Sequence, residues 1–265
     1  MTFKIVIPAR FASSRLPGKP LRELAGKPLV EHVYACAIAS GADEVVVATD
    51  DERIRRTVEE FGGKACMTRA EHVSGTDRIE EVTAAQGWTD ETIVVNLQGD
   101  EPMMPPRLLR QVAEILRNNT SAAMATLCTP IQSYDEVFNP NIVKVVRDRN
   151  NRALLFSRAP IPWDRATFPE PANGLEAQAL YARHLGLYAY RVGFLKCFVR
   201  WPACELETIE SLEQLRALWN GETIWVEEAL AIPGHGVDTE RDLQAAEEAL
   251  RLRQSRDDDL MAPNR

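Results

Sequence analysis

The chain has 265 residues, of which 45% are hydrophobic and 26% are charged, and its formal net charge is -8 at pH 7. This length and composition are those of a globular protein with a sizeable core, which excludes disorder as the main state. The negative charge argues against general binding to nucleic acid, because the phosphates would be repelled. No stretch reaches the roughly 20 apolar residues that span a bilayer, and the first residues do not resemble a secretory signal. We therefore expect a cytoplasmic protein without membrane insertion.

The first half of the sequence alternates apolar runs of strand length with patterns typical of helices. Strands are predicted at 3–9, 43–50, 64–68 and 92–98, and helices at 28–40, 53–61, 76–87 and 106–118. In the helix at 28–40, Pro28 suits the first turn and Gly41 suits the end. Apolar runs that are separated by helices are typical of right-handed βαβ units. The pattern therefore predicts an α/β fold with a mostly parallel sheet.

The second half changes character after residue 140. A β-hairpin is predicted from 142–148 and 152–158, with Asn150 and Asn151 at the turn. Strands follow at 184–191 and 223–230, a helix that closes at Asn220 and Gly221 spans 210–221, and a loop from 234 leads into a last helix. No internal repeat or linker is visible. We predict one domain over residues 1–250 and a polar tail at 251–265, frayed from Gln254 onward.

The cysteines and histidines give no sign of a metal centre. The five cysteines contain no CxxC pair and are expected to be reduced and buried: Cys36, Cys66, Cys128, Cys197 and Cys204. His32 is placed on a helix, and His72 and His235 are placed in loops, without an HExxH or HxH pattern that would indicate zinc. No GxSxG motif or activated nucleophile is evident. The absence of these motifs therefore favours direct displacement over covalent catalysis.

Polar clusters follow three of the predicted strands: PAR, TDD and QGDEP. Because ligands of open α/β sheets bind beyond the carboxyl ends of the strands, we expect all three clusters at one edge. The loop after the first strand has small residues that let an anion approach the backbone, and cations that attract it: Ala12, Ser13, Ser14 and Gly18, with Arg10, Arg15 and Lys19. It is neither a Walker loop nor a GxGxxG turn. Between residues 10 and 27 five positive charges face one negative charge, which suits a small polyphosphate.

Two separated aspartates are candidate ligands of a hard cation. Mg²⁺ takes one or two carboxylates and leaves its other positions to water and substrate phosphates, and Asp100 follows a strand beside Gly99. The alternative for Asp100 is a turn or cap residue. Asp238 directly precedes Thr239, which has capping-box spacing with Asp242. If the last strand lay beside the fourth, Asp100 and Asp238 would face one ion.

The segment HVSGTDR, at 72–78, also precedes a helix. Ser74 and Asp77 have capping-box spacing, and capping alone explains these two residues. It does not explain Gly75 and Arg78, for which we predict a ligand-binding role.

Glu101, which is followed by Pro102, is expected to hold the turn that positions Asp100.

Nine segments, in order from about residue 3 to about residue 250, together resemble the 3-deoxy-manno-octulosonate (KDO) cytidylyltransferase family: PARFASSRLPGKPL, ATDD, HVSGTDR, NLQGDEP, FNPNIVKVV, FSRAPIPWDR, RHLGLYAYR, ESLEQLRALWNG and GHGVDTERDL. The resemblance implies a Rossmann-like nucleotidyltransferase fold of the glycosyltransferase-A type, with a small antiparallel hairpin subdomain and dimerisation and sugar-binding elements at about 130–190. It also implies a cytoplasmic homodimer that requires Mg²⁺. Such an enzyme makes CMP-KDO and pyrophosphate from CTP and KDO for lipopolysaccharide biosynthesis.

The same resemblance implies roles for individual residues. Arg10 and Lys19 would hold the CTP phosphates and, with Asp100, act in catalysis. The cytidine and sugar pocket would be lined by Ser74, Gly75, Arg78 and Gln98. Asp100 and Asp238 would be the metal ligands. Five further residues would face KDO: Arg158, His184, Tyr188, Glu210 and Gln214.

Three alternatives remain open at this point. The acid sugar could be a sialic or pseudaminic acid or 8-amino-KDO. The chain could be a Rossmann-type oxidoreductase, although the glycine fingerprint of that class is missing. It could also be a nucleotide-binding regulatory protein without turnover. The two candidate metal aspartates argue against that last alternative, because mere binding needs no metal at the α-phosphate.

Overall fold

The computed structural model describes residues 2–12, 16–166, 168, 181–234 and 236–261. Its contacts divide the chain into two compact units, and each unit combines segments that are distant in the sequence. Unit 1 comprises Met1–Gln86, Asn96–Leu109 and Pro233–Arg265, and unit 2 comprises Gly87–Val95 and Arg110–Ile232. No helix of the described residues is both long and apolar enough to cross a membrane.

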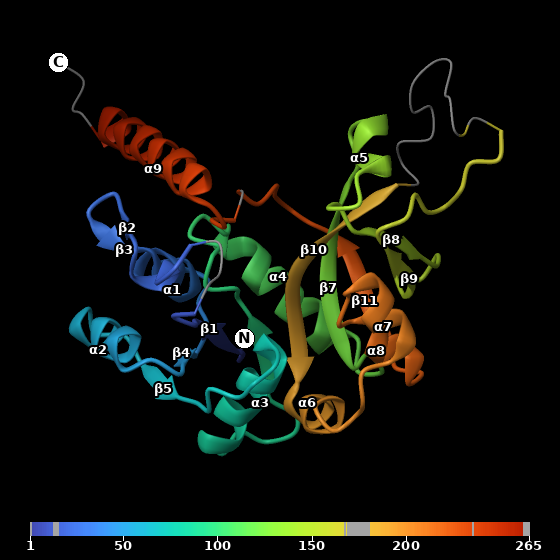
Figure 1. Cartoon of the computed structure of the whole chain (residues 1–265), viewed down its shortest axis with the longest axis horizontal. Helices are drawn as coiled ribbons and strands as arrows, with labels where there is room; N and C mark the ends of the chain where they lie inside the picture. The colour runs from blue at the N-terminus through green and yellow to red at the C-terminus, as the bar shows by residue number, and fades with distance from the viewer. Residues whose placement is uncertain (1, 13–15, 167, 169–180, 235, 262–265) are drawn as a thin grey trace. The chain divides into compact units, whose positions relative to one another are not determined.

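Unit 1 is built on a parallel sheet in the order β1-β4-β5 (Figure 1). Its strands are β1 (Lys4–Pro8), β4 (Glu44–Thr49) and β5 (Ala65–Met67), and its helices are α1 (Leu29–Ala39), α2 (Glu52–Glu60), α3 (Gly75–Ala85) and α9 (Glu240–Met261). Three short elements follow β1: the 3₁₀ helix η1 (Lys19–Leu21), β2 (Glu23–Leu24) and β3 (Lys27–Pro28). The strands and helices predicted for residues 3–87 are all present.

The apolar runs explain why these strands form the core of unit 1. Ile5, Val6 and Ile7 are each 0% exposed, and β1 pairs with β4 in the register Val6↔Val46 and Pro8↔Ala48. Because β1 and β4 are parallel neighbours, their carboxyl ends meet at one edge. Past the last residue of β6, Leu97 donates a hydrogen bond to the Val6 carbonyl at 3.1 Å. The three polar clusters therefore lie at the same edge, as predicted.

Unit 2 contains the antiparallel part of the larger sheet. β10 (Ala182–Arg191) is antiparallel to β7 (Met124–Pro130), and β11 (Ile224–Glu228) is parallel to β7. The predicted hairpin is present as β8 (Lys144–Arg147) and β9 (Ala153–Ser157), with Asn151 at φ 62 in its turn. The helices of this unit are α5 (Tyr134–Phe138), α6 (Val192–Phe198), α7 (Glu205–Glu210) and α8 (Leu215–Trp219). Two elements run from one unit into the other along the chain, β6 (Ile93–Asn96) and α4 (Pro106–Asn118).

The helix predicted at 210–221 is wrong in its extent. Residues 205–210 form α7 and residues 215–219 form α8. Ser211, at φ 51 and ψ 50, is left-handed and ends α7. The predicted closure at Asn220 and Gly221 is confirmed, because Asn220 is the C-cap of α8 and Gly221 has φ 80.

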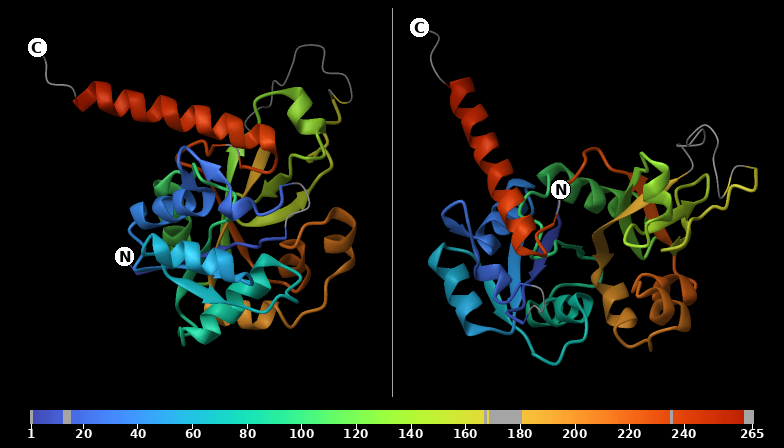
Figure 2. Two further views of the ribbon diagram at one scale, coloured as in Figure 1. Left: turned by 60° about the vertical axis from the view of Figure 1, so that its left-hand side comes forward. Right: turned by 45° about the horizontal axis from the view of Figure 1, so that its top comes forward.

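Other differences from the sequence predictions are local. The strand β7 was not predicted, and β11 pairs with it, so the condition that the last strand lies beside the fourth is not met. Pro28 is the N-cap of α1 and not a residue of its first turn. α9 continues to Met261, where a frayed tail was expected. Figure 2 shows α9 as one long helix, and its first turns bury Leu243 and Ala246.

The prediction of five buried cysteines is only partly right. All five lie within the described residues, and none forms a disulfide. Cys128 and Cys204 are buried, Cys36 and Cys66 are half-buried, and Cys197 is exposed. Burial raises the pKa of the Cys128 thiol to about 11. That thiol is therefore protonated at neutral pH and unsuited to nucleophilic chemistry.

Candidate active site

A cleft of about 330 Å³ opens in unit 1 at the carboxyl end of β1. Four segments line it: the end of β1 with the loop after it, η1, the loop after β6 and the loop before α9. The lining residues are Pro8, Ala9, Arg10, Ala12, Lys19, Pro20, Gln98, Gly99, Asp100 and Asp238. Six of these were predicted to bind an anion, substrate or metal: Arg10, Ala12, Lys19, Gln98, Asp100 and Asp238. The predicted anion-binding residues Ser13, Ser14 and Arg15 lie outside the described part of the chain, as does His235.

Gly99 explains why the loop after β6 can reach the end of β1. A Cβ atom at this position would lie 2.6 Å from the Pro8 carbonyl oxygen, a distance that real Cβ atoms do not adopt. The absence of a side chain therefore lets the two backbones touch. This contact places the next residue, Asp100, in the cleft. Glu101 continues the turn, with its N–H donating to the Gln98 carbonyl at 3.2 Å.

Asp100 and Asp238 converge on one cation, the ammonium of Lys19. Lys19 Nζ lies 2.8 Å from Asp100 Oδ2 and 2.9 Å from Asp238 Oδ1. Burial by itself lowers the pKa of Lys19, but the charges and hydrogen bonds of the two aspartates outweigh it and raise the pKa above 10.5. Lys19 is therefore charged at neutral pH. The prediction that the two aspartates share one cation site is consistent with this geometry.

The loop before α9 delivers Asp238 to the cleft. Val237 donates its N–H to the Asp100 carbonyl at 2.8 Å, which ties the two aspartate loops together. The predicted capping box is present: Asp242 accepts from the Thr239 N–H at 2.8 Å, and Thr239 Oγ1 accepts from the Asp242 N–H at 3.3 Å. This cap satisfies backbone groups at the start of α9 and fixes the direction in which the helix leaves the cleft.

The two carboxylates fit the needs of Mg²⁺. No group of three or more His, Cys, Asp or Glu side chains able to hold a metal occurs among the described residues. Mg²⁺ does not need such a cage, because it binds through one or two carboxylates and takes the remaining oxygens from water and substrate phosphates. The position between Asp100 and Asp238 already accommodates a positive charge, that of Lys19. The residues present therefore suit a hard divalent cation.

Arg10 and Gln98 complete the polar lining of this cleft. Arg10 lies two residues after the end of β1 and lines the cleft. No carboxylate in the described part of the chain forms an ion pair with it. Gln98 Nε2 donates to Asn96 Oδ1 at 3.3 Å. A guanidinium with no partner carboxylate at the ligand edge is suited to binding an anion.

The predicted residues of α3 take two different positions. The capping box of Ser74 and Asp77 is complete, which gives both side chains a structural task. A Cβ at Gly75 would lie 3.6 Å from Pro8 Cγ, so the start of α3 packs against a residue of the cleft wall. Arg78 is fully buried, and its guanidinium donates to Asp50 Oδ2 at 2.7 Å and to Thr68 Oγ1.

These contacts limit what the TDD cluster and Arg78 can do. Asp50 is the ion-pair partner of Arg78, and Asp51 is the N-cap of α2, where it accepts from the Arg53 N–H at 2.9 Å. Both aspartates therefore serve the fold of unit 1. The ligand role of Arg78 remains a prediction, and in this structure its side chain contacts the protein's own groups.

In unit 2, Arg158 and Glu210 are linked to each other. The Glu210 carboxylate accepts from the Arg158 N–H at 2.9 Å and from Ser157 Oγ at 2.5 Å. Arg158 Nε donates to the Glu210 carbonyl at 2.7 Å, and its Nη1 donates to the Pro140 carbonyl at 2.9 Å. Glu210 thus orients Arg158, and its own contact with a sugar remains a prediction.

Lys144, which the sequence analysis did not select, supports the same segment. Its side chain is fully buried, and Nζ donates to the carbonyls of Asn139 at 3.0 Å, Ile142 at 2.7 Å and Arg158 at 2.6 Å. Burial lowers the pKa of Lys144, since the desolvation of the ammonium outweighs the attraction of Glu210. The three carbonyls hold this cation in place of a direct carboxylate partner.

His184, Tyr188 and Gln214 are the other predicted sugar-facing residues. Desolvation lowers the pKa of His184 to about 3, so the imidazole is neutral. Its Nε2 lies 3.1 Å from Thr126 Oγ1, and its ring lies 5.3 Å from that of Tyr188, a phenol whose pKa burial raises well above 10. Gln214 is 5% exposed, and its Nε2 has no hydrogen-bond partner within the described residues. Its contact with a sugar remains a prediction.

Comparison with known proteins identifies the family. The family model described as cytidylyltransferase matches residues 4–224. The chain is 55% identical over 252 residues to the 3-deoxy-manno-octulosonate cytidylyltransferase of Thioalkalivibrio sulfidiphilus (strain HL-EbGR7), covering 95% of this chain and 100% of that protein. This chain belongs to the 3-deoxy-manno-octulosonate cytidylyltransferase family.

Further members of the family support the assignment. The protein of that name from Idiomarina loihiensis (strain ATCC BAA-735 / DSM 15497 / L2-TR) is 53% identical over 246 residues, covering 93% of this chain and 97% of the relative. A solved structure of CMP:2-keto-3-deoxy-manno-octonic acid synthetase complexed with CTP superposes with a TM-score of 0.85. It is 43% identical, and the match covers 95% of this chain and 99% of that one. The resemblance and the nucleotidyltransferase fold class predicted from the sequence are confirmed, and the oxidoreductase alternative is wrong.

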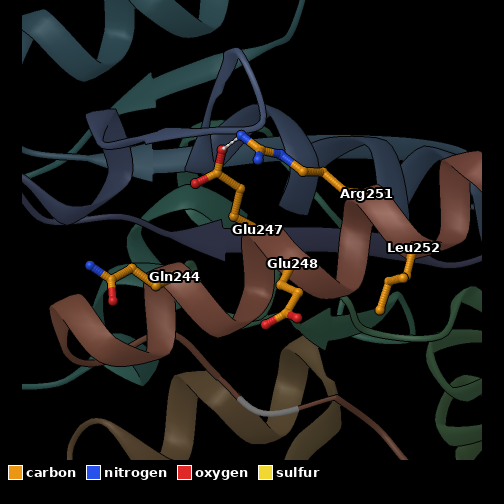
Figure 3. Close-up of a pocket in the computed structure, with 5 residues that line it drawn as sticks. All are labelled: Gln244, Glu247, Glu248, Arg251 and Leu252. Atoms are coloured by element: carbon orange, nitrogen blue, oxygen red, sulfur yellow. Dashed lines mark hydrogen bonds and ion pairs between the residues drawn. The ribbon is translucent and has the colours of Figure 1, made fainter.

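A second hollow, on α9, is not a candidate site of this cytidylyltransferase. Figure 3 shows its five lining residues, all on one helix: Gln244, Glu247, Glu248, Arg251 and Leu252. Glu247 and Arg251 pair with each other at 2.6 Å in the i,i+4 arrangement of an ordinary helix surface. Among the described residues, no second element supplies a group that would define a ligand position there.

Proposed function

We propose that this member of the family transfers CMP from CTP to the anomeric hydroxyl of KDO, releasing pyrophosphate, and that its product serves lipopolysaccharide biosynthesis. The observation that carries the proposal is the convergence of Asp100 and Asp238 on one cation, in a cleft that Arg10 also lines. Two carboxylates that can hold a metal beside cations that can hold phosphates are what phosphoryl-type transfer requires. The names of the relatives supply the substrates.

The cations of the cleft would bind the triphosphate and stabilise the leaving group. Arg10 and Lys19 lie on the wall of the same cleft, and both side chains are charged donors with no competing acceptor function. They would place the α-phosphorus for in-line attack and neutralise the charge that develops on pyrophosphate. Arg10 follows β1 and Lys19 begins η1, so both side chains extend from backbone at the carboxyl edge of the sheet.

Asp100 and Asp238 would hold Mg²⁺ through their carboxylate oxygens. Mg²⁺ bound there supplies Lewis-acid chemistry, which polarises the α-phosphate and lowers the pKa of the attacking hydroxyl. The contact of the Val237 N–H with the Asp100 carbonyl keeps the two carboxylates together before any ligand arrives. Among the described residues, no side chain of the cleft lining is a histidine or cysteine, and the proposal includes no protein base at this wall.

For the acid sugar, Arg158 is the proposed partner of the carboxylate. Its Nε and Nη1 donate to protein carbonyls, which fixes the guanidinium plane. His184 is neutral and contributes a hydrogen bond but no charge. The buried Nε2 of Gln214 adds a donor. A site of this kind rejects an analogue that lacks the matching polar group, because its buried donors would be left unpaired.

The test is a panel of acid sugars offered with CTP and Mg²⁺, with pyrophosphate release and the CMP-sugar measured by mass spectrometry. KDO should give a kcat/KM at least ~10²-fold above those of 8-amino-KDO, a sialic acid and pseudaminic acid. A higher value for another sugar would replace KDO as the substrate. If CTP is turned over with none of these sugars, the proposal is rejected.

We also propose a homodimer that works in the cytoplasm. Unit 2 exposes large apolar side chains on β9, α7 and α8, which a second subunit would cover: Leu154 at 60%, Ile209 at 81% and Trp219 at 58% exposed. Light scattering after size exclusion should give twice the chain mass of 29.7 kDa. A mass of one chain at assay concentration would reject the dimer.

A further inference from the structure

We propose that Lys19 competes with the divalent metal for Asp100 and Asp238, so that the ammonium must leave the two carboxylates before the metal binds. This inference rests on the proposed function, because it concerns the metal of that reaction. It adds a role that phosphate binding alone does not give to Lys19. The lysine would hold the carboxylates together in the absence of ligand and keep the metal site weak until the nucleotide is present.

The geometry makes the two cations mutually exclusive. Lys19 Nζ lies 2.8 Å from Asp100 Oδ2 and 2.9 Å from Asp238 Oδ1. A Mg²⁺ ion bound by the same two oxygens would lie about 2.1 Å from each, which is the region that Nζ occupies. The ammonium also halves the net charge of the carboxylate pair, from two negative charges to one. Both effects weaken metal binding while Lys19 stays in place.

The lysine can move without a change in the fold. Lys19 is the first residue of η1, and its backbone is held by the Lys19 N–H bond to the Leu16 carbonyl at 3.1 Å and by the left-handed Gly18 before it, at φ 66. Its flexible side chain carries the charge to the cleft, and 14% of it is exposed. An ammonium on a four-carbon stem can therefore swing from the aspartates to another acceptor while the backbone stays fixed.

A triphosphate in the same cleft is the natural second acceptor. Its oxygens would draw the ammonium away from the position between Asp100 and Asp238, so nucleotide and metal would each favour the binding of the other. Arg10 lines the same cleft but pairs with no carboxylate of the described residues. It is therefore a matched control: its removal takes away one positive charge from the cleft without vacating the position between the aspartates.

The first test measures the binding of Mn²⁺ alone, without nucleotide or sugar, by electron paramagnetic resonance. Lys19→Met should bind Mn²⁺ at least ~10-fold more tightly than wild type, within the range of such couplings. Arg10→Met should bind it with less than a ~3-fold change. Lys19→Met binding no tighter than wild type would overturn the proposal. An equal gain in Arg10→Met would also overturn it, because the effect would then be general charge removal.

A second test uses the wild-type chain and does not depend on how a variant folds. Amine acetylation of Lys19, followed by mass spectrometry, should be slow in the metal-free protein and at least several-fold faster with saturating Mn²⁺, when the ammonium has been displaced. Acetylation of Lys27, an exposed lysine paired with Glu31, is the internal control. Unchanged labelling of Lys19 would overturn the proposal. Neither test uses a sugar, so failure of the KDO assignment and failure of this inference are distinguishable.

Discussion

Arg22 and Glu240, which are 218 positions apart in the sequence, form an ion pair within unit 1. Arg22 Nη2 lies 2.7 Å from Oε1 and 2.9 Å from Oε2 of Glu240. Arg22 directly follows η1, whose first residue is Lys19, and Glu240 is the first residue of α9. Lys19, at the start of η1, thus contacts Asp238, and Arg22, just after the end of η1, contacts the start of α9.

We predict that Arg22→Gln lowers kcat/KM measurably and leaves the free energy of unfolding almost unchanged. The pair is exposed, so its loss should reduce the free energy of unfolding by about 1 kcal/mol or less. Loosening the entry to α9 should displace Asp238 and reduce kcat/KM by roughly 3- to 10-fold, since small errors of position are costly in catalysis. Lys27→Gln, which removes the exposed Lys27–Glu31 pair, is the control. Equal activities of the two variants would contradict the prediction.

Gly99→Ala is expected to destabilise unit 1. The new Cβ would lie 2.6 Å from the Pro8 carbonyl oxygen, and backbone cannot yield as a flexible side chain can. Such overpacking costs about 1–3 kcal/mol, measurable by urea denaturation. Gly75→Ala, whose Cβ would meet Pro8 Cγ at an ordinary 3.6 Å, should stay within about 0.5 kcal/mol of wild type. The prediction fails if both alanines are tolerated alike.

Lys144→Met should separate the binding of the two substrates. Three carbonyls would lose their donor in a buried site, which is expected to lower the free energy of unfolding by about 1–3 kcal/mol. Because one of these carbonyls belongs to Arg158, the KM for KDO should rise while the KM for CTP stays near wild type. Lys196→Met, which breaks an exposed pair with Asp90, serves as the comparison. A parallel rise of both KM values would argue against a specific role at the sugar.

The neutral state of His184 predicts a pH dependence of stability. Its pKa is about 3 in the folded protein, below the ordinary 6.5, so below pH 6.5 the unfolded chain binds a proton that the folded protein does not. Stability should therefore fall as the pH drops from 6.5 toward 3, by up to about 1.4 kcal/mol per unit. His184→Gln should remove this slope in urea denaturation at pH 7 and pH 5. An imidazole NMR titration of His184 with a midpoint near 6.5 would contradict the assignment.

The sequence predicts the parts of the fold that depend on local pattern. Runs such as Ile5–Ile7 and the capping boxes at Ser74 and Thr239 are local signals, and each is present. The edge position of Asp100 could also be predicted, because the end of a parallel strand is defined by topology. The extent of the helix predicted at 210–221 could not be predicted correctly. Ser211 adopts a left-handed conformation that ends α7, and its residue type does not indicate this conformation.

Contacts between residues that are far apart in the sequence could not be predicted from it. Nothing near Lys144 in the sequence indicates that its ammonium contacts three carbonyls, because these are backbone groups, which every residue carries. Arg78 has the motif of a ligand-binding residue, yet it is buried against Asp50. Asp238 reaches Asp100 through the loop before α9 and not through the placement of the last strand, so the pairing was predicted but its route was not.

The central claim is that Asp100 and Asp238 act together on one metal in nucleotidyl transfer, and a double-mutant cycle of kcat/KM tests it most directly. Asp100→Asn and Asp238→Asn should each reduce kcat/KM for KDO by at least ~10²-fold, and the double variant should lose little more than either, because both remove the same function. Glu31→Gln, at a carboxylate of α1 outside the cleft lining, should stay within ~3-fold of wild type. Losses that multiply in the double variant, or near-normal activity in either single variant, would contradict a shared site.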